Sequence, residues 1–155
     1  MKKLEDIRSS KEFIKFITGV DLVDIYIKSS DTNIEKKDIA KKDNLVTLKE
    51  NYEIIENKKN SFQVLCRFSL HVINGKKIPI KINVSYNLIY KTQKKIKKIF
   101  FKPLIDFHVK FTVAPYFREF VGNTSLRMSV SSIILPEFKL ISKALKEETK
   151  IKKKK

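Results

Sequence analysis

The sequence predicts an α+β fold, in which antiparallel strands come first and helices from the C-terminal part cover their apolar face. Residues 61–73 and 77–91 both alternate apolar and polar side chains, which is the period of a strand with one buried face. Asn74 and Gly75 lie between them and predict a tight hairpin turn, because both residues tolerate a positive φ. After Lys102 the apolar residues recur at three- and four-residue steps, which indicates a helix.

The length and composition predict one soluble domain. With 155 residues, 42% of them hydrophobic, the chain can bury a core of its own. We expect this domain to span residues 1–150 and the lysines of residues 151–155 to form a disordered tail. No apolar run reaches the roughly 18 residues of a membrane span, and the N-terminus turns acidic where a signal peptide would continue apolar. The protein is therefore expected in the cytoplasm.

The first predicted element is a short amphipathic helix over residues 9–18. Ser9 or Ser10 supplies the cap, and Gly19 marks the end of the helix. The apolar side chains Phe13, Ile14 and Ile17 lie on one side. Packing is the expected role of this helix.

Two strands and a long connection follow. Residues 22–28 are rich in Val, Ile and Tyr and predict a strand. Residues 29–44 are polar and are expected to form a connection, although its two isoleucines need apolar surroundings. A second strand is expected near residues 45–56.

The two strands of the hairpin have one apolar and one polar face. The first strand directs alternate residues from Phe62 to Val72 inward, and the second does the same from Ile78 to Tyr90. The opposite face, which includes His71, is expected to be wet. Cys66 belongs to the inward set, so we expect a buried core thiol rather than a reactive nucleophile.

The C-terminal part predicts two helices. The first runs about 25 residues from Pro103 to near Met128 and contains Pro115, whose cost of about 3 kcal/mol favours a kink. Residues 130–135 form an apolar connection. A second, shorter helix begins after Leu135, with Phe138, Ile141 and Leu145 on its apolar side.

The sequence contains no pattern typical of a catalytic or metal site. Its glycines are isolated from one another, so they cannot form a phosphate-binding loop. Cys66, His71 and His108 are too few for a closed zinc site, and neither histidine has a recognisable acid, base or metal partner. We therefore expect no cofactor, no metal and no enzymatic activity.

The net charge of +17 admits two interpretations. Of the 34 basic residues, 30 are lysine, and the chain is also rich in isoleucine and asparagine, as the codon usage of an AT-rich genome would produce. Alternatively, lysine clusters at residues 91–102 and 152–155 bind a polyanion. The scarcity of arginine argues against a module that reads nucleic acid, which stays the alternative from another functional class.

A motif in the long helix resembles the SecB family of protein-export chaperones. It runs from Val113 to Val121 as Val-Ala-Pro-Tyr-Phe-Arg-Glu-Phe-Val, and Leu126-Arg-Met128 and Ile133-Ile-Leu-Pro136 follow. The mid-helix Pro-Tyr-x-Arg-Glu is its specific part. The upstream strands fall in the family's order, so the resemblance spans about residues 20–145.

This resemblance implies a four-stranded antiparallel sheet packed against one long and one shorter C-terminal helix. It also implies a homotetramer, a dimer of dimers that pack through the long helices. The aromatic side chains of that helix exceed what one sheet face can cover and agree with an oligomer interface, although a helix buried all round in a monomer is the alternative. The predicted interface residues are Phe107, Phe111, Tyr116 and Phe120.

The function implied by the resemblance is an ATP-independent holdase that keeps unfolded preproteins or other non-native chains from aggregating. The same fold also serves as a chaperone dedicated to the antitoxin of a toxin–antitoxin pair. Clients are expected to bind apolar grooves, since burial of apolar side chains needs no sequence code. The matching positions are Ile34, Ile39 and Leu45 in the connection, Val130, Ile133, Ile134 and Leu135 after the long helix, and Phe138, Leu140 and Ile141 in the second helix.

The chain departs from the SecB pattern at the expected contact with the export motor SecA. Family members that use this motor are acidic and place carboxylates on the outer sheet face after the first strand. Here that place reads Ser29-Ser30-Asp31, and the whole chain is strongly basic. This departure argues against a SecA contact and fits the antitoxin alternative.

Overall fold

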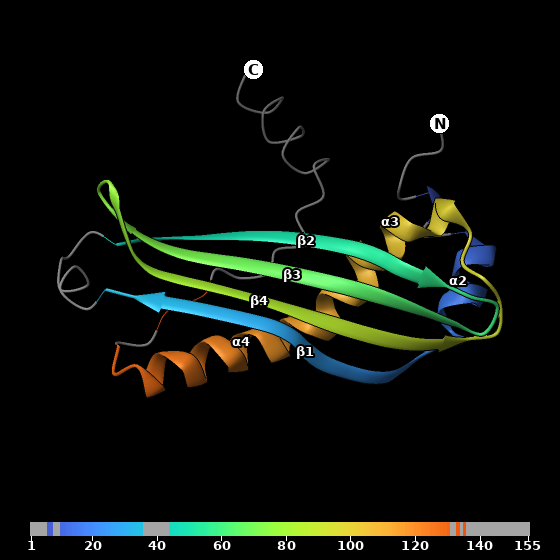
Figure 1. The fold of residues 1–155 in the computed structure, drawn as a ribbon. Helices are drawn as coiled ribbons and strands as arrows, with labels where there is room; N and C mark the ends of the chain where they lie inside the picture. The colour runs from blue at the N-terminus through green and yellow to red at the C-terminus, as the bar shows by residue number, and fades with distance from the viewer. Residues whose placement is uncertain (1–5, 8–9, 36–43, 131–132, 134, 136–155) are drawn as a thin grey trace, which may run out of the picture.

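One four-stranded antiparallel sheet with a long helix along one face makes up the fold of the computed structural model (Figure 1). The structure describes residues 6–7, 10–35, 44–130, 133 and 135. Strands β1 (Val20–Ile34), β2 (Leu45–Asn57), β3 (Ser61–Asn74) and β4 (Lys77–Thr92) lie in the order β1-β4-β3-β2. The helices are α2 (Lys11–Ile17), α3 (Phe101–Leu104) and α4 (Lys110–Arg127), with a 3₁₀ turn over Lys98–Phe100 and a π-helical turn over Ile105–Val109.

The predicted α+β class, the four-stranded antiparallel sheet and the long helix are confirmed. From Phe101 to Arg127 the helical segments follow one another directly, close to the predicted span from Pro103 to Met128. The shorter helix predicted after Leu135 and the lysine tail lie outside the described residues.

Strand β1 is longer than its sequence predicts. It starts at Val20 and continues into the first part of the segment predicted as a polar connection, with Ser29 paired to Ser85 and Ile34 paired to Ile80 of β4. Serine, aspartate and asparagine have low strand propensity. The neighbouring strand of 16 residues nevertheless offers backbone partners along its whole length, and these hydrogen bonds decide the conformation. The prediction that the connection begins at residue 29 is therefore wrong.

The short helix α2 forms close to its predicted position. The hydroxyl of Ser10 accepts a hydrogen bond from the Phe13 backbone N–H at 3.2 Å, as an N-cap should. Phe13 is buried, and its ring lies 5.4 Å from that of Phe100. Ile14 was expected on the packing side, but it is 49% exposed, so that part of the prediction is wrong.

The hairpin turn is shifted by one residue from its predicted position. Asn74 pairs with Lys77 as part of the ladder, so the two loop residues are Gly75 and Lys76. Gly75 has φ of 58°, a value that glycine adopts without a steric penalty. Asn74 is instead extended, and its side-chain amide donates to Asn44 Oδ1 at 3.1 Å.

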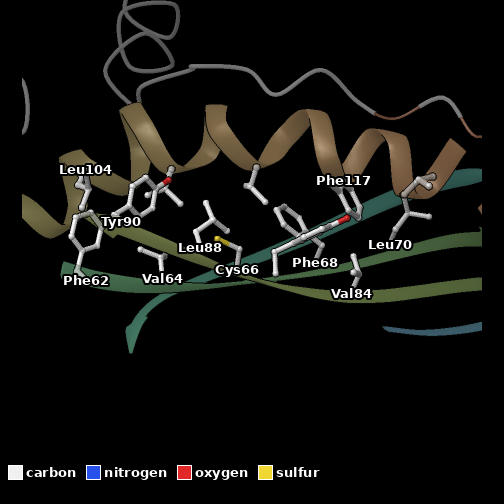
Figure 2. Close-up of a cluster of buried hydrophobic side chains, with 14 of the residues drawn as sticks. Phe62, Val64, Cys66, Phe68, Leu70, Val84, Leu88, Tyr90, Leu104 and Phe117 are labelled. Carbon is white, nitrogen blue, oxygen red and sulfur yellow. The ribbon is translucent and has the colours of Figure 1, made fainter. Parts of the chain in front are cut away.

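The sheet buries its apolar face under the long helix (Figure 2). All the inward residues predicted on β3, from Phe62 to Val72, are buried, and on β4 the same holds from Ile80 to Tyr90. Ile78 is the exception at 47% exposed, because it lies next to the hairpin turn at the end of the sheet. Phe117 of α4 stacks on Phe68 with 4.4 Å between ring centroids, which holds the helix against the sheet centre.

The outer face of the sheet, opposite the long helix, is less uniformly exposed to solvent than the sequence predicts. Leu65 and Asn87, both on that face, are buried. The Asn87 side-chain amide donates to Tyr26 Oη at 2.7 Å and to Gln63 Oε1 at 3.0 Å. A small polar network thus covers the outer side of the sheet between β1 and β3.

Ser129 ends α4 in a conformation that serine rarely adopts. Its φ is 54°, and the Val130 N–H donates to the Ser125 carbonyl at 3.1 Å, which is the bond of a Schellman cap. A left-handed conformation costs a non-glycine residue roughly 1–2 kcal/mol.

We expect Ser129→Gly to raise the melting temperature by about 2–4 °C, since about 1 kcal/mol of strain is released. Ser129→Val should lower it, because a β-branched side chain fits the left-handed region worst. Thermal unfolding followed by circular dichroism checks both variants. Equal melting temperatures for the two variants would contradict the assignment of strain to this residue.

Candidate client-binding surface

A row of apolar side chains crosses one end of the sheet on its inner face. Ile34 of β1 pairs with Ile80 of β4, Ile80 with Val72 of β3, and Val72 with Val46 of β2. The central two are buried, whereas Ile34 and Val46 at the sheet edges are only partly buried. The edges of this row therefore remain available to a further apolar surface.

The chain beyond α4 returns to this apolar core. After the reversal at Ser129, the side chains of Val130, Ile133 and Leu135 are partly buried and pack against the core cluster. Three of the four residues predicted to bind clients in this connection thus lie where their side chains border the core and remain partly open to solvent. The fourth, Ile134, lies outside the described residues.

The other predicted client-binding residues are placed differently. Ile34 lies at the end of β1 and borders the core, as the prediction requires, but in a strand instead of a connection. Leu45 is 62% exposed, and because Val46 faces the core, alternation along β2 directs Leu45 to the outer face. Ile39 and the residues of the second helix, Phe138, Leu140 and Ile141, lie outside the described residues.

The edge strand β2 contributes residues that the sequence interpretation missed. Val46, Leu48 and Ile54 are partly buried and pack against the core from this edge. The signal was present in the alternation of residues 46–54, which is interrupted by polar residues and is therefore weaker than in β3. Together with Val130, Ile133 and Leu135, they form a set of partly buried apolar side chains, which we name the apolar rim.

A polar cluster connects β2 to the long helix in the middle of this edge. Tyr52 Oη donates to Glu50 Oε2 at 2.9 Å, and Lys110 Nζ lies 5.3 Å from the centre of the Tyr52 ring. Lys110 also pairs with Asp106 at 3.3 Å. Burial, together with the Glu50 carboxylate, raises the pKa of Tyr52, so this hydroxyl stays protonated. The cluster fixes the helix relative to the edge strand.

The predicted interface aromatics divide into two pairs. Phe111 and Tyr116 are 47% and 42% exposed on α4, whereas Phe107 and Phe120 are half-buried. Phe117 belongs to the same helix, but its ring packs on Phe68 of the sheet within the subunit. Two large aromatic side chains on one helix therefore face solvent.

The described residues include Cys66 and both histidines of the chain. Among the described residues, no cluster of three His, Cys, Asp or Glu side chains could hold a metal ion. Burial raises the pKa of the Cys66 thiol to about 12, so it remains protonated, in agreement with the predicted core position. Within the same residues, no helix is long and apolar enough to cross a bilayer.

His108 gives the protein a pH-dependent stability. Burial lowers the pKa of this imidazole below its ordinary value of 6.5. The unfolded chain therefore takes up a proton at a higher pH than the folded chain. It follows that the contribution of His108 to the free energy of unfolding is complete above pH 6.5 and is lost as the pH falls through the folded pKa.

We expect the urea midpoint of the protein to fall between about pH 7.5 and pH 5, and the variant His108→Gln to show a smaller fall. His71→Gln is the matched control. The pKa of His71 is also lowered, by partial burial and then by Lys81 and Lys49, but this side chain is far less buried, so its effect should be smaller. An unchanged pH slope in His108→Gln would contradict the assignment.

The comparison with known proteins identifies the fold. No family model matches the sequence, and no curated protein does. Among solved structures, the chain is similar to the SecB-like chaperone Rv1957 of Mycobacterium tuberculosis, solved in complex with a ChAD peptide from the HigA1 antitoxin Rv1956. The TM-score is 0.71 over 88% of this chain and 100% of that chain. The fold is SecB-like.

At 12% sequence identity, this SecB-like likeness concerns the path of the backbone and not the individual side chains. A protein of unknown function from Streptococcus agalactiae is also similar, with a TM-score of 0.46 and 7% identity over 76% of this chain and 97% of that chain. The resemblance predicted from the helix motif is thus confirmed at the level of the fold.

Proposed function

We propose that this SecB-like chain is an ATP-independent chaperone that binds an extended, non-native polypeptide segment, and that an antitoxin is a better supported client than exported preproteins. The observation behind the proposal is the fold shared, over nearly all of this chain, with a SecB-like chaperone that binds an antitoxin peptide. Such a protein acts by binding in the cytoplasm and needs neither catalytic residues nor a cofactor.

The apolar rim supplies a physical means of binding such a segment. Its side chains are only partly buried, so an extended client that covers them removes apolar surface from water, and this burial favours binding. Full burial of an exposed aliphatic side chain contributes about 1.5–3 kcal/mol to the binding free energy, and completing the burial of a partly buried one contributes a fraction of this. Several such contacts are needed before binding exceeds the cost of ordering the client.

The residues on the outer face of the sheet favour the antitoxin hypothesis over a role that requires contact with SecA. Ser29 shares a hydrogen bond with Ser85 at 2.8 Å, and Asp31 accepts one from the Asn83 amide at 3.3 Å. These residues border a shallow hollow of about 520 Å³, whose charged lining residues are two acids and two bases, Asp31, Glu50, Lys49 and Arg67. A motor site built on clustered carboxylates would need a different surface here.

A panel of clients tests the proposal. Three unrelated proteins are denatured and diluted into the purified chain at low salt and at about 0.5 M salt, and their aggregation is followed by light scattering. A dedicated chaperone should bind an unfolded antitoxin with high affinity and protect the panel weakly, whereas protection of the whole panel would support the export reading. Absence of binding to every client would overturn the proposal.

We also propose that the chain forms a tetramer through the long helices. The exposed aromatics Phe111 and Tyr116 are the strongest support, with Phe107 and Phe120 beside them in the same helical segment. Exposed aromatic side chains grouped on one helix are typical of a subunit interface, where aromatic residues are enriched.

The double variant Phe111→Ser and Tyr116→Ser is therefore expected to reduce the particle mass from four subunits to two or one, as measured by light scattering coupled to size exclusion. Leu126→Ser is the matched control, because this residue is 73% exposed on the same helix and was not predicted at the interface. An unchanged mass in the double variant would place the interface elsewhere.

A further inference from the structure

Three segments that are distant in sequence meet at one end of the sheet (Figure 1). They are α2, the β2–β3 turn at residues 57–61, and residues 91–102. The Phe13 ring packs on Phe100. The side-chain amide of Asn57 donates to the Ile96 carbonyl at 3.0 Å and accepts from the Ile96 N–H at 3.1 Å. These contacts fix the three backbones relative to one another.

The exposed side chains of these segments are mostly lysines. Two come from α2, two from the turn and six from residues 91–102: Lys11, Lys15, Lys58, Lys59, Lys91, Lys94, Lys95, Lys97, Lys98 and Lys102. The only acidic residue within the three segments is Glu12. We name this surface the lysine end.

Few of these charges are neutralised within the described part of the chain. Lys97 pairs with Glu12, Lys58 pairs with Glu56, and Lys102 pairs with Asp106 at 3.2 Å. The remaining seven lysines make no salt bridge there. Six of these ten lysines belong to the cluster predicted at residues 91–102, and the fold adds four further lysines, from α2 and the β2–β3 turn, to the same surface.

The lysine end also exposes two isoleucine side chains. Ile14 is 49% exposed on α2, and Ile99 is 51% exposed between Lys98 and Phe100. The three segments contain no arginine, and their phenylalanines are buried or half-buried. A nucleic-acid surface usually offers arginine forks or exposed aromatic rings for stacking. Lysines interspersed with exposed isoleucines instead complement carboxylates interspersed with aliphatic side chains.

We infer that the lysine end is a second binding surface, and that its partner is an acidic polypeptide segment that carries aliphatic side chains. Because the three backbone segments are packed together, the Cα positions of the lysines are fixed before a partner binds. Less conformational entropy is therefore lost on binding. The opposite charges accelerate and orient the encounter. None of the residues of the lysine end belongs to the apolar rim, so this inference does not depend on the proposed client binding there.

Equilibrium binding tests the inference with two fluorescent probes, a 16-residue peptide of alternating Glu and Leu and an oligouridine of the same length. The test variant combines Lys94→Gln, Lys95→Gln and Lys98→Gln. The control combines Lys28→Gln, Lys76→Gln and Lys81→Gln, which are exposed and lie outside the lysine end. Both triple variants carry the same net charge, so a difference between them reports the position of the lysines.

We expect the peptide to bind the parent protein, the test variant to weaken this binding at least tenfold and the control at most threefold. Ile99→Ser should weaken peptide binding and leave the RNA probe unaffected. Equal losses in the two triple variants would reduce the effect to net charge and overturn the inference. Tighter binding of the RNA than of the peptide, or no peptide binding, would also overturn it.

Two controls keep this test separate from the proposed function. Thermal melting of both triple variants confirms that they are folded. Val130→Ser with Ile133→Ser alters the apolar rim and should leave peptide binding at the lysine end unchanged. A protein that fails to bind clients but still binds the acidic peptide would therefore contradict only the proposed chaperone function.

Discussion

Phe117→Ala is expected to lower the free energy of unfolding by about 3–5 kcal/mol, the usual range for removal of a fully buried phenylalanine. The Phe117 side chain is fully buried, and its ring stacks on Phe68 with an interplanar angle of 16°. Phe68 in turn contacts Tyr86 and Tyr52 edge-on at 6.1 and 5.9 Å. The substitution would therefore leave a cavity at the centre of the helix–sheet interface.

Urea denaturation followed by circular dichroism measures this loss. Leu126→Ala on the same helix is the control, because its side chain is largely exposed and should change stability by less than about 0.5 kcal/mol. A loss of under about 1 kcal/mol for Phe117→Ala would mean that α4 does not pack on the sheet through this residue.

The double variant Val130→Ser and Ile133→Ser is expected to weaken client binding by roughly 10- to 100-fold. Both side chains belong to the apolar rim, and each contributes about 1 kcal/mol or somewhat more when a client completes its burial. The readout is the concentration of chaperone that half-suppresses aggregation of the client, or its affinity for an unfolded antitoxin.

Leu45→Ser is the matched control for this experiment. Leu45 was also predicted to bind clients, but it lies on the outer face of the sheet and should change binding by no more than about twofold. Because the rim residues also pack against the core, thermal melting must show that the double variant is folded at the assay temperature. If Leu45→Ser alone weakens binding, the client surface lies on the outer face.

The core of the sheet was predictable because its signal is local. Alternation over β3 and most of β4 assigned the inward side chains, and every residue predicted to face inward from Phe62 to Val72 is buried. The helix motif around Pro115 was equally local, and the SecB-like fold that it implied is the one observed. Both predictions needed only the order of neighbouring residues.

Other features depended on partners far along the chain. The polar residues 29–33 form a strand because β4, about fifty residues later, supplies their hydrogen bonds. Leu65 and Asn87 are buried on the face predicted to be exposed to solvent, and Asn87 forms a hydrogen-bond network with Tyr26 and Gln63 across three strands. No local pattern contains this information.

The candidate surfaces divide in the same way. The sequence by itself determined the hairpin faces, the long aromatic helix, and the apolar character of residues 130–135, since each depends on a repeat of two to four residues. Only the tertiary structure decided that Val130 and Ile133 return to the core while Leu45 points away, and that three lysine segments meet at one end. Pairing register and packing between distant segments determine those positions, and they exist only once the chain has folded.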